Sequence, residues 1–100
     1  MAARANSANP RRLTASELRA ISRALSDPTR FEILKHIAAT PCAACADLRQ
    51  VFPITAATLS HHLHELESCG LIATSRRGKF IDAVFQRTLW KAYVNALKEI

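Results

Sequence analysis

The stretch from Thr55 to Gly70, TAATLSHHLHELESCG, constrains the fold most, because it carries the end signals of one helix. The Thr55 hydroxyl can accept hydrogen bonds from the unpaired backbone amides of a first turn. Gly70 can adopt the left-handed conformation that ends a helix, at little cost. Between these ends an apolar stripe recurs at helical spacing. Its members are Leu59, Leu63 and Leu66, with His62 and Cys69 along the same face.

The opposite face of this helix carries small residues and compact hydrogen-bonding groups. These are Ala57, Ser60, His61, His64 and Ser68. No long acidic side chain occurs in the N-terminal half, because Glu65 and Glu67 come later. A helix that enters a DNA groove needs a face of this kind. We therefore interpret Thr55 to Gly70 as a recognition helix.

Size and charge narrow the class of protein. A chain of 100 residues makes one small domain with a modest core. The net charge of +6 favours an anionic partner such as nucleic acid. No apolar run approaches the roughly 18 residues that a membrane span needs, and the N-terminus lacks the apolar stretch of a secretory signal. We expect a cytoplasmic protein with no membrane partner.

The remaining segments give a predicted order of elements. Residues 1–12 read as a flexible N-terminal arm, and residues 13–100 as the domain. We expect helices over 14–25 and 28–39, the second burying Phe31, Leu34, Ile37 and Ala38. Thr40 and Pro41 predict the start of a short third helix that reaches about residue 50, with Ala44, Cys45, Leu48 and Val51 inward. The VFPI segment then makes a turn, because Pro53 disfavours helix at Phe52.

After Gly70 the pattern of apolar residues no longer has the helical period. LIATS and FIDAVFQ are two β-prone runs on either side of Arg76, Arg77, Gly78 and Lys79, which predicts a hairpin with a basic tip. Such a tip can contact phosphate beside a recognition helix, and this interpretation is favoured over an ordinary solvated turn. Together the elements predict a mainly α winged helix-turn-helix with a small β-hairpin wing.

Thr88 is expected to cap a last helix, LWKAYVNALKEI, with a broad apolar side. That side offers more apolar surface than the edge of a small domain needs. We expect it to pack on the first helix and on a second copy of the chain. The expected dimer residues are Leu18, Ile21, Trp90, Tyr93 and Leu97.

The phrases ALSDPTRFEILKHI and TLSHHLHELESCGLI, followed by the RRGK hairpin, resemble the ArsR/SmtB family of metal-sensing bacterial repressors. The resemblance covers residues 18–97 and implies a homodimer of winged helices that leaves operator DNA when an effector binds. It also implies that Thr58, Ser60 and His61 take DNA-reading positions. The full set of expected DNA contacts is Thr55, Ala57, Thr58, Ser60, His61, His64, Arg76, Arg77 and Lys79.

Three features depart from that family pattern. Members often carry glutamine or serine where this chain has Ala56 and Ala57, so direct base contacts are expected to be few. The family's thiols are usually one residue apart and followed directly by Asp-Leu, whereas here the run is CAACADL. The Asp/His pairs that some members carry on the last helix are absent, because that helix contains no Asp and no His, and its one acidic residue is Glu99.

Three cysteines, an odd number, argue against a disulfide framework and leave metal binding, redox chemistry or simple burial. On one helix Cys42 and Cys45 would share a face and could bind a thiophilic ion or oxidise to a disulfide. Arsenite, which can bind three sulfurs or two sulfurs plus another donor, fits this pair of thiols better than zinc, which prefers four tetrahedral ligands. Cys69 could add a third thiol, although its inner position favours burial. The alternative is that Cys45 is a small core residue and that Cys42 has no role in sensing.

Several functions compete at this point. A dithiol enzyme is disfavoured, because thioredoxin-like chemistry normally uses a βαβ setting that this sequence lacks. We expect no enzyme and no required cofactor. A protein-binding winged helix is disfavoured by the basic wing. A repressor that senses thiol oxidation, and a regulator with no metal or redox sensing, both remain open beside the arsenite-responsive repressor.

Overall fold

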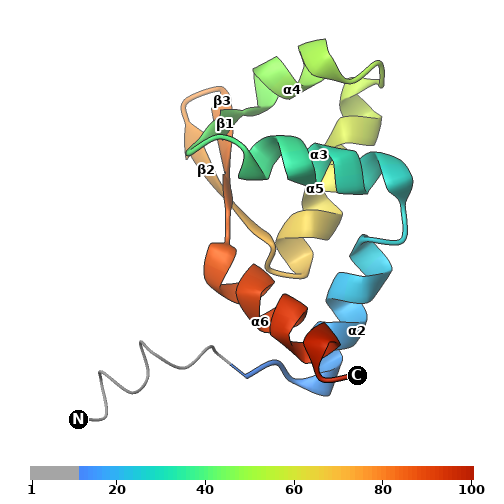
Figure 1. Cartoon of the computed structure of the whole chain (residues 1–100). Coiled ribbons are helices and arrows are strands. Elements are labelled where there is room, and N and C mark those ends of the chain that lie inside the picture. Colours follow the sequence, from blue (N-terminus) through green and yellow to red (C-terminus); the bar gives the residue numbers. More distant parts are fainter. Residues whose placement is uncertain (1–11) are drawn as a thin grey trace, which may run out of the picture.

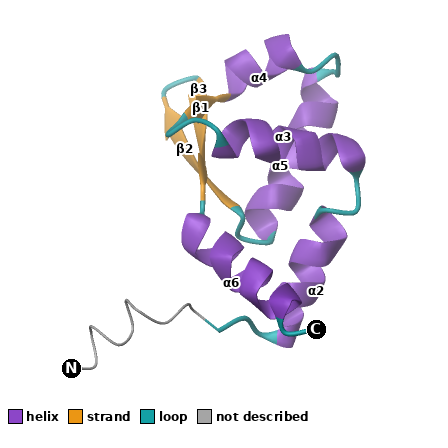
Figure 2. Cartoon of the chain, in the orientation of Figure 1, coloured by secondary structure: helices purple, strands orange, loops and turns teal. Residues whose placement is uncertain are grey.

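The computed structural model describes residues 12–100, and Figures 1 and 2 show a helical chain with one small sheet at its side. Of the expected arm, only Arg12 lies within the described part. The order of elements is α2 (Ala15–Ala24), α3 (Pro28–Ala38), β1 (Ala43–Ala44), α4 (Cys45–Val51), α5 (Ala56–Ser68), β2 (Ile72–Arg77), β3 (Phe80–Phe85) and α6 (Arg87–Lys98). No helix among residues 12–100 is long and apolar enough to cross a membrane. The mainly α winged helix-turn-helix prediction is confirmed.

The first two helices begin with side-chain caps. Thr14 forms a capping box with Glu17 at the start of α2, each side chain bonding the other residue's backbone amide. The Asp27 carboxylate accepts from the amide of Arg30 at 3.0 Å, and Pro28 occupies the first turn of α3. These two helices therefore start where the sequence predicts.

The interior phase of α3 differs from the prediction. Ile33, Leu34 and Ile37 are buried, whereas Phe31 is 37% exposed. Phe31 lies on the outer side, where the ammonium of Lys35 sits 5.8 Å from its ring centroid. The inward face is thus rotated toward Ile33 and away from Phe31. The expectation that Phe31 is buried was wrong.

The predicted start of the third helix was also wrong. Residues 40–42 are not helical, and residues 43–44 form β1, which pairs antiparallel with β3 through Ala43–Ala83 and Ala44–Asp82. Helix α4 then begins at Cys45 with no side-chain cap. Leu48 is fully buried, as expected, but Val51 is 51% exposed. A strand pairing to a distant part of the chain has replaced the local cap that Thr40 and Pro41 indicate.

The sheet has the order β1-β3-β2, with both pairings antiparallel. Buried residues of the helices and of this sheet form one core, which includes Ile21, Ile33, Leu34, Ile37, Leu48, Leu59, Leu66, Leu71, Ile72 and Ala83. Helix α6 lies beside α2 (Figure 1), and the Ser22 and Tyr93 hydroxyls that join them are 3.0 Å apart. Gln86, and not Thr88, occupies the cap position of α6, and no side chain bonds there.

Candidate nucleic-acid interface

Helix α5 has the ends and faces that its sequence indicates. The Thr55 hydroxyl accepts from the backbone amide of Thr58 at 3.1 Å and also donates to the Thr58 hydroxyl at 3.0 Å. Gly70 has φ +89°, in the left-handed region. The expected outer residues are exposed, namely Ala57, Thr58, Ser60, His61, His64 and Ser68. The helix therefore presents a small, polar and largely uncharged face to solvent.

A buried arginine holds the inner side of α5. Arg30, on α3, donates through Nε to Nδ1 of His62 at 3.2 Å and through Nη1 to the carbonyl of Ala24 at 3.1 Å. Both side chains are buried. His62 therefore contacts the side chain of another helix through Nδ1. Arg30 belongs to the DPTR phrase. Its contact with His62 could not be predicted from helical periodicity, because the two residues are 32 positions apart in the sequence and lie on different helices.

The environment of His62 favours the neutral ring. Burial is the main cause that lowers its pKa, and the charges of Arg30 and His61 act in the same direction. The carboxylate of Asp27 acts the other way, with a smaller effect than burial. A neutral ring with an unprotonated Nδ1 is the form that can accept from Arg30. The contact between α3 and α5 therefore depends on the protonation state of one histidine.

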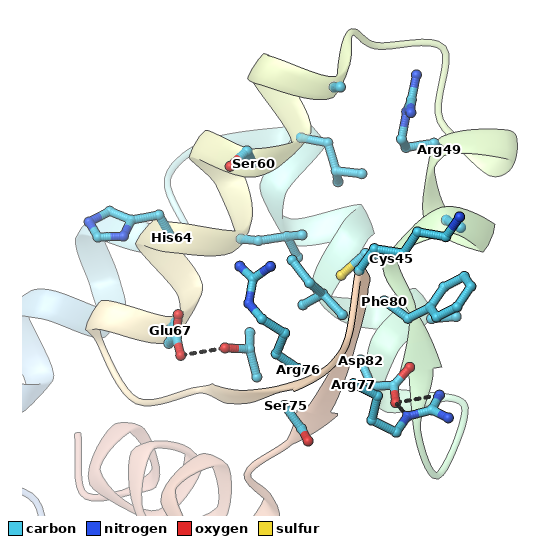
Figure 3. Close-up of a pocket in the computed structure, with 18 residues that line it drawn as sticks. Cys45, Arg49, Ser60, His64, Glu67, Ser75, Arg76, Arg77, Phe80 and Asp82 are labelled. Carbon is cyan, nitrogen blue, oxygen red and sulfur yellow. Dashed lines mark hydrogen bonds and ion pairs between the residues drawn. The ribbon is translucent and has the colours of Figure 1, made fainter.

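The wing contains two arginines with different surroundings. Arg76 and Arg77 lie at the end of β2, and the turn itself is Gly78 and Lys79, with Gly78 at φ +61°. Arg77 pairs with the buried carboxylate of Asp82, both Nε and Nη2 lying 2.9 Å from Oδ2. Figure 3 shows Arg76 turned instead toward α5. Adjacent strand residues point to opposite faces, so of these two arginines Arg76 is the one directed at α5, and it has no ion pair to another residue in 12–100.

A groove lies between α4, α5 and the hairpin, with a volume of about 540 Å³. Ser60 and His64 line it from α5, and Arg76 and Lys79 line it from the wing. Arg49 of α4 is a further lining cation that the sequence interpretation did not select. Arg77 lines the groove as well, so the structure brings five of the nine expected DNA contacts to one concave surface.

The cysteines do not form the expected helical pair. Cys42 is exposed and precedes β1, whereas Cys45 is the first residue of α4 and half-buried. Burial, and secondly the charge of Asp82, raise the pKa of Cys45. Burial also raises the pKa of Cys69, whose Sγ donates to the carbonyl of Leu66 at 3.3 Å. Residues 12–100 hold no group of three or more His, Cys, Asp or Glu side chains arranged to take a metal.

The expected dimer residues differ in how much surface they offer. Ile21 is fully buried in the core of the single chain and Tyr93 is 7% exposed, so neither presents a face to a partner. Leu18 and Trp90 are half-buried, and Leu97 is 44% exposed. Of the five expected residues, Leu97 has the largest exposed fraction.

Comparison with known proteins agrees with this architecture. A helix-turn-helix domain family matches residues 25–75. The chain is 40% identical over 62 residues to an arsenical resistance operon repressor of Staphylococcus xylosus, a match that covers 62% of this chain and 59% of that protein. It is 32% identical over 75 residues to the transcriptional repressor SdpR of Bacillus subtilis, covering 75% of this chain and 82% of that protein.

A solved structure is similar over most of the chain. The ArsR-like transcriptional regulator from Rhodococcus sp. RHA1 superimposes with a TM-score of 0.75 at 26% identity, covering 84% of this chain and 78% of that one. The match to the staphylococcal repressor spans less than two thirds of that repressor's length. These similar proteins are transcriptional regulators and not enzymes.

Proposed function

The chain belongs to the ArsR family of winged-helix transcriptional regulators, and from this premise we propose that it represses transcription by binding double-stranded operator DNA. One observation carries the proposal: the exposed polar face of α5 and the uncompensated wing cations border the same groove. The helix fits a major groove, and the cations fit the flanking phosphates. We expect the protein to act in the cytoplasm.

The two parts of this surface have different roles in the proposal. Arg76 and Lys79 contact phosphates, which fixes position without reading sequence. Ser60, His61 and His64 reach base edges from α5, with Thr58 at the N-terminal end of the same face. Arg77 contributes less, because Asp82 already compensates its charge. Ala57 leaves room for close approach and supplies no hydrogen bond.

DNA-binding measurements on point variants test this division. The probe is a duplex selected from a random pool, with affinity measured over a range of salt concentrations. Arg76→Gln and Lys79→Gln should each flatten the log–log salt slope by about one unit on every duplex, and Arg77→Gln should flatten it less. Arg23→Gln, a neutralised exposed cation on α2, is the matched control. Absence of any salt-dependent binding to duplex DNA would refute the proposal.

Contacts to base edges are tested by measuring sequence preference. Ser60→Ala or His61→Ala should lower the preference for the selected duplex over a scrambled one, by about 1–3 kcal/mol for each lost base contact. The salt slope should stay near that of the unaltered protein. Wing variants that change sequence preference, with helix variants that change only the slope, would show that the assignment of roles is reversed.

We propose further that the protein acts as a homodimer through α2 and α6. Leu97, exposed on α6, and Ile100 beyond the end of that helix supply apolar surface beside the half-buried Leu18 and Trp90. Two recognition helices would then meet half-sites about one helical turn apart. Leu97→Glu should weaken both self-association in sedimentation and DNA binding. A stable monomer at micromolar concentration that still binds tightly would contradict the dimer.

The effector proposal rests on the two thiols beside β1. We propose that arsenite, or another thiophilic metal ion, binds Cys42 and Cys45 and releases the DNA. Support comes from the similarity to a protein named as an arsenical resistance operon repressor and from the spacing of the thiols on either side of Ala43 and Ala44. Oxidation of the same thiols is the alternative trigger, and regulation with neither metal nor redox sensing is the second alternative.

A release assay distinguishes these triggers. Arsenite, zinc and peroxide are added in parallel to the protein–DNA complex, with Cys42→Ser, Cys45→Ser and Cys69→Ser as variants. The first two should keep DNA binding and lose release. Cys69→Ser should mainly lower stability, unless Cys69 acts as a third thiol ligand. Normal release from the Cys42/Cys45 double variant would end the dithiol proposal.

A further inference from the structure

The groove between α4, α5 and the hairpin has properties that phosphate contact does not require. Its volume of about 540 Å³ lies in the range of small-molecule sites, which usually run from about 300 to 1,000 Å³. The lining includes a set of apolar side chains, namely Leu59, Leu63, Phe80 and Ile81. Phosphodiester oxygens gain nothing from an apolar lining, whereas a flat hydrocarbon ring does.

The charges around the groove are unequal. Its two carboxylates already have partners inside the protein: Glu67 accepts from the Thr74 hydroxyl at 2.7 Å, and Asp82 pairs with Arg77 at 2.9 Å. Arg49, Arg76 and Lys79 also line the groove, and none of them has a hydrogen bond or an ion pair to another described residue. The groove therefore attracts an anion. Arginine is the cation that holds a carboxylate through two parallel hydrogen bonds.

Cys45 adds to the apolar character and not to the charge. Figure 3 shows its sulfur directed into the groove. Burial and the neighbouring Asp82 raise the pKa of this thiol, which keeps it protonated at neutral pH. A neutral thiol is a soft, polarisable contact for an aromatic ring and does not repel an anion.

From these observations we propose that the groove binds a small aromatic carboxylate and that this ligand excludes DNA. The ring lies against Leu63 and against Ile81, which is paired with Arg76 across the hairpin and shares its face, and the carboxylate meets Arg76. Such a ligand occupies Arg76 and covers Ser60 and His64, so it competes with the duplex for the same surface. This competition rests on the proposed DNA-binding function, whereas the ligand site itself does not.

A fluorescent anion of the same shape tests the site without DNA. The probe is 1-anilinonaphthalene-8-sulfonate, titrated into the full chain, and its fluorescence should rise to saturation at one site per chain. Naphthalene-1-carboxylate should displace it. Naphthalene-1-methanol, which has the same ring and no charge, should displace it at least tenfold less well. Equal displacement by the two compounds would overturn the anionic site.

Matched variants locate the bound probe. Arg76→Gln should weaken probe binding about tenfold, while Arg23→Gln on α2 leaves it unchanged. Leu97→Glu tests the competing apolar surface on α6 and should also leave it unchanged. Circular dichroism melts of each variant confirm that the chain is folded. Loss of binding in Leu97→Glu, or equal loss in the two arginine variants, would overturn the proposal.

Competition with duplex DNA completes the test. Naphthalene-1-carboxylate should lower the affinity for the selected duplex in the unaltered protein, and Arg76→Gln should need about tenfold more of it for the same fractional loss. Probe binding without any duplex binding would refute the DNA-binding function and leave the ligand site standing. Duplex binding with no saturable probe site would refute the ligand site alone.

Discussion

The two helices of the helix-turn-helix, α4 and α5, have boundaries of different origin. Helix α5 begins at a threonine that caps its own first turn and ends beside a glycine with positive φ. Helix α4 has no side-chain cap and begins where β1 pairs with β3. The boundaries of α5 depend on neighbours in sequence, and the start of α4 depends on a strand far along the chain. Only the first kind can be read from a local pattern.

Core substitutions should produce the largest effects and should show no difference between the two helices. Leu48 on α4 and Leu66 on α5 are both fully buried, so Leu48→Ala and Leu66→Ala should each lower the free energy of unfolding by about 2–5 kcal/mol. Urea denaturation measures this. Val51→Ala, at an exposed site on α4, should change it by less than about 0.5 kcal/mol. A small cost for Leu48→Ala alone would mean that α4 is held only by the strand pairing.

Gly70→Ala tests the local stop signal of α5. A Cβ at this position would meet Cδ2 of Leu89 at 2.9 Å, and φ +89° strains any other residue. We expect a loss of about 2 kcal/mol in urea denaturation. Gly78→Ala, at φ +61° with open space around it, should cost about 1 kcal/mol. Equal costs would remove the contact with Leu89 from the explanation.

Two threonines test the start signals. Thr55→Ala removes the hydroxyl that accepts from the Thr58 amide, and should cost about 1 kcal/mol. Thr40→Ala removes a hydroxyl that donates to the carbonyl of Ile37 at 3.3 Å and caps no helix, so it should cost less than about 0.5 kcal/mol. Thermal melts of the pair measure the difference. A larger cost at Thr40 would mean that α4 does use a local cap.

A change of pH is the smallest perturbation, since it adds one proton to the contact between α3 and α5. The pKa of His62 is lowered in the folded chain. Between this folded pKa and the ordinary histidine pKa of about 6.5, the unfolded chain therefore binds more protons than the folded chain. The free energy of unfolding should therefore fall as pH drops through 6.5 toward the folded pKa. His62→Gln should reduce this dependence, and His61→Gln should retain most of it, because burial is the main cause of the lowered pKa of His62. An unchanged pH profile in His62→Gln would contradict the assignment.

The sequence predicts most of the fold because most of its boundaries are local. Thr14, Asp27 and Thr55 cap the helices that follow them, and the hairpin turns at Gly78. The inward face of α3 was less predictable, because Phe31 and Ile33 are both apolar and only packing decides between them. Helix propensity does not separate them, because it is nearly the same for phenylalanine and isoleucine.

The candidate site was predictable in its residues and less so in its contacts. The outer face of α5 follows from helical periodicity, and the exposure of Ser60, His61 and His64 agrees with it. The ion pair between Arg77 and Asp82 depends on the register of β2 against β3, and this register cannot be obtained by counting charged residues in the sequence. The inward position of Cys45 follows from periodicity, but the effect of the Asp82 charge on its pKa depends on the pairing of Ala44 with Asp82, which periodicity does not reveal.

The two-residue strand β1 also bears on the order in which the chain assembles. Its partner Ala83 comes forty residues after Ala43, so this pair must close a long loop before it contributes any stability. The caps of α3 and α5 close within three residues. The recognition helix can therefore form early, while the start of α4 waits for the hairpin. Pulse-labelled hydrogen exchange should accordingly protect amides of α5 before those of residues 43–44.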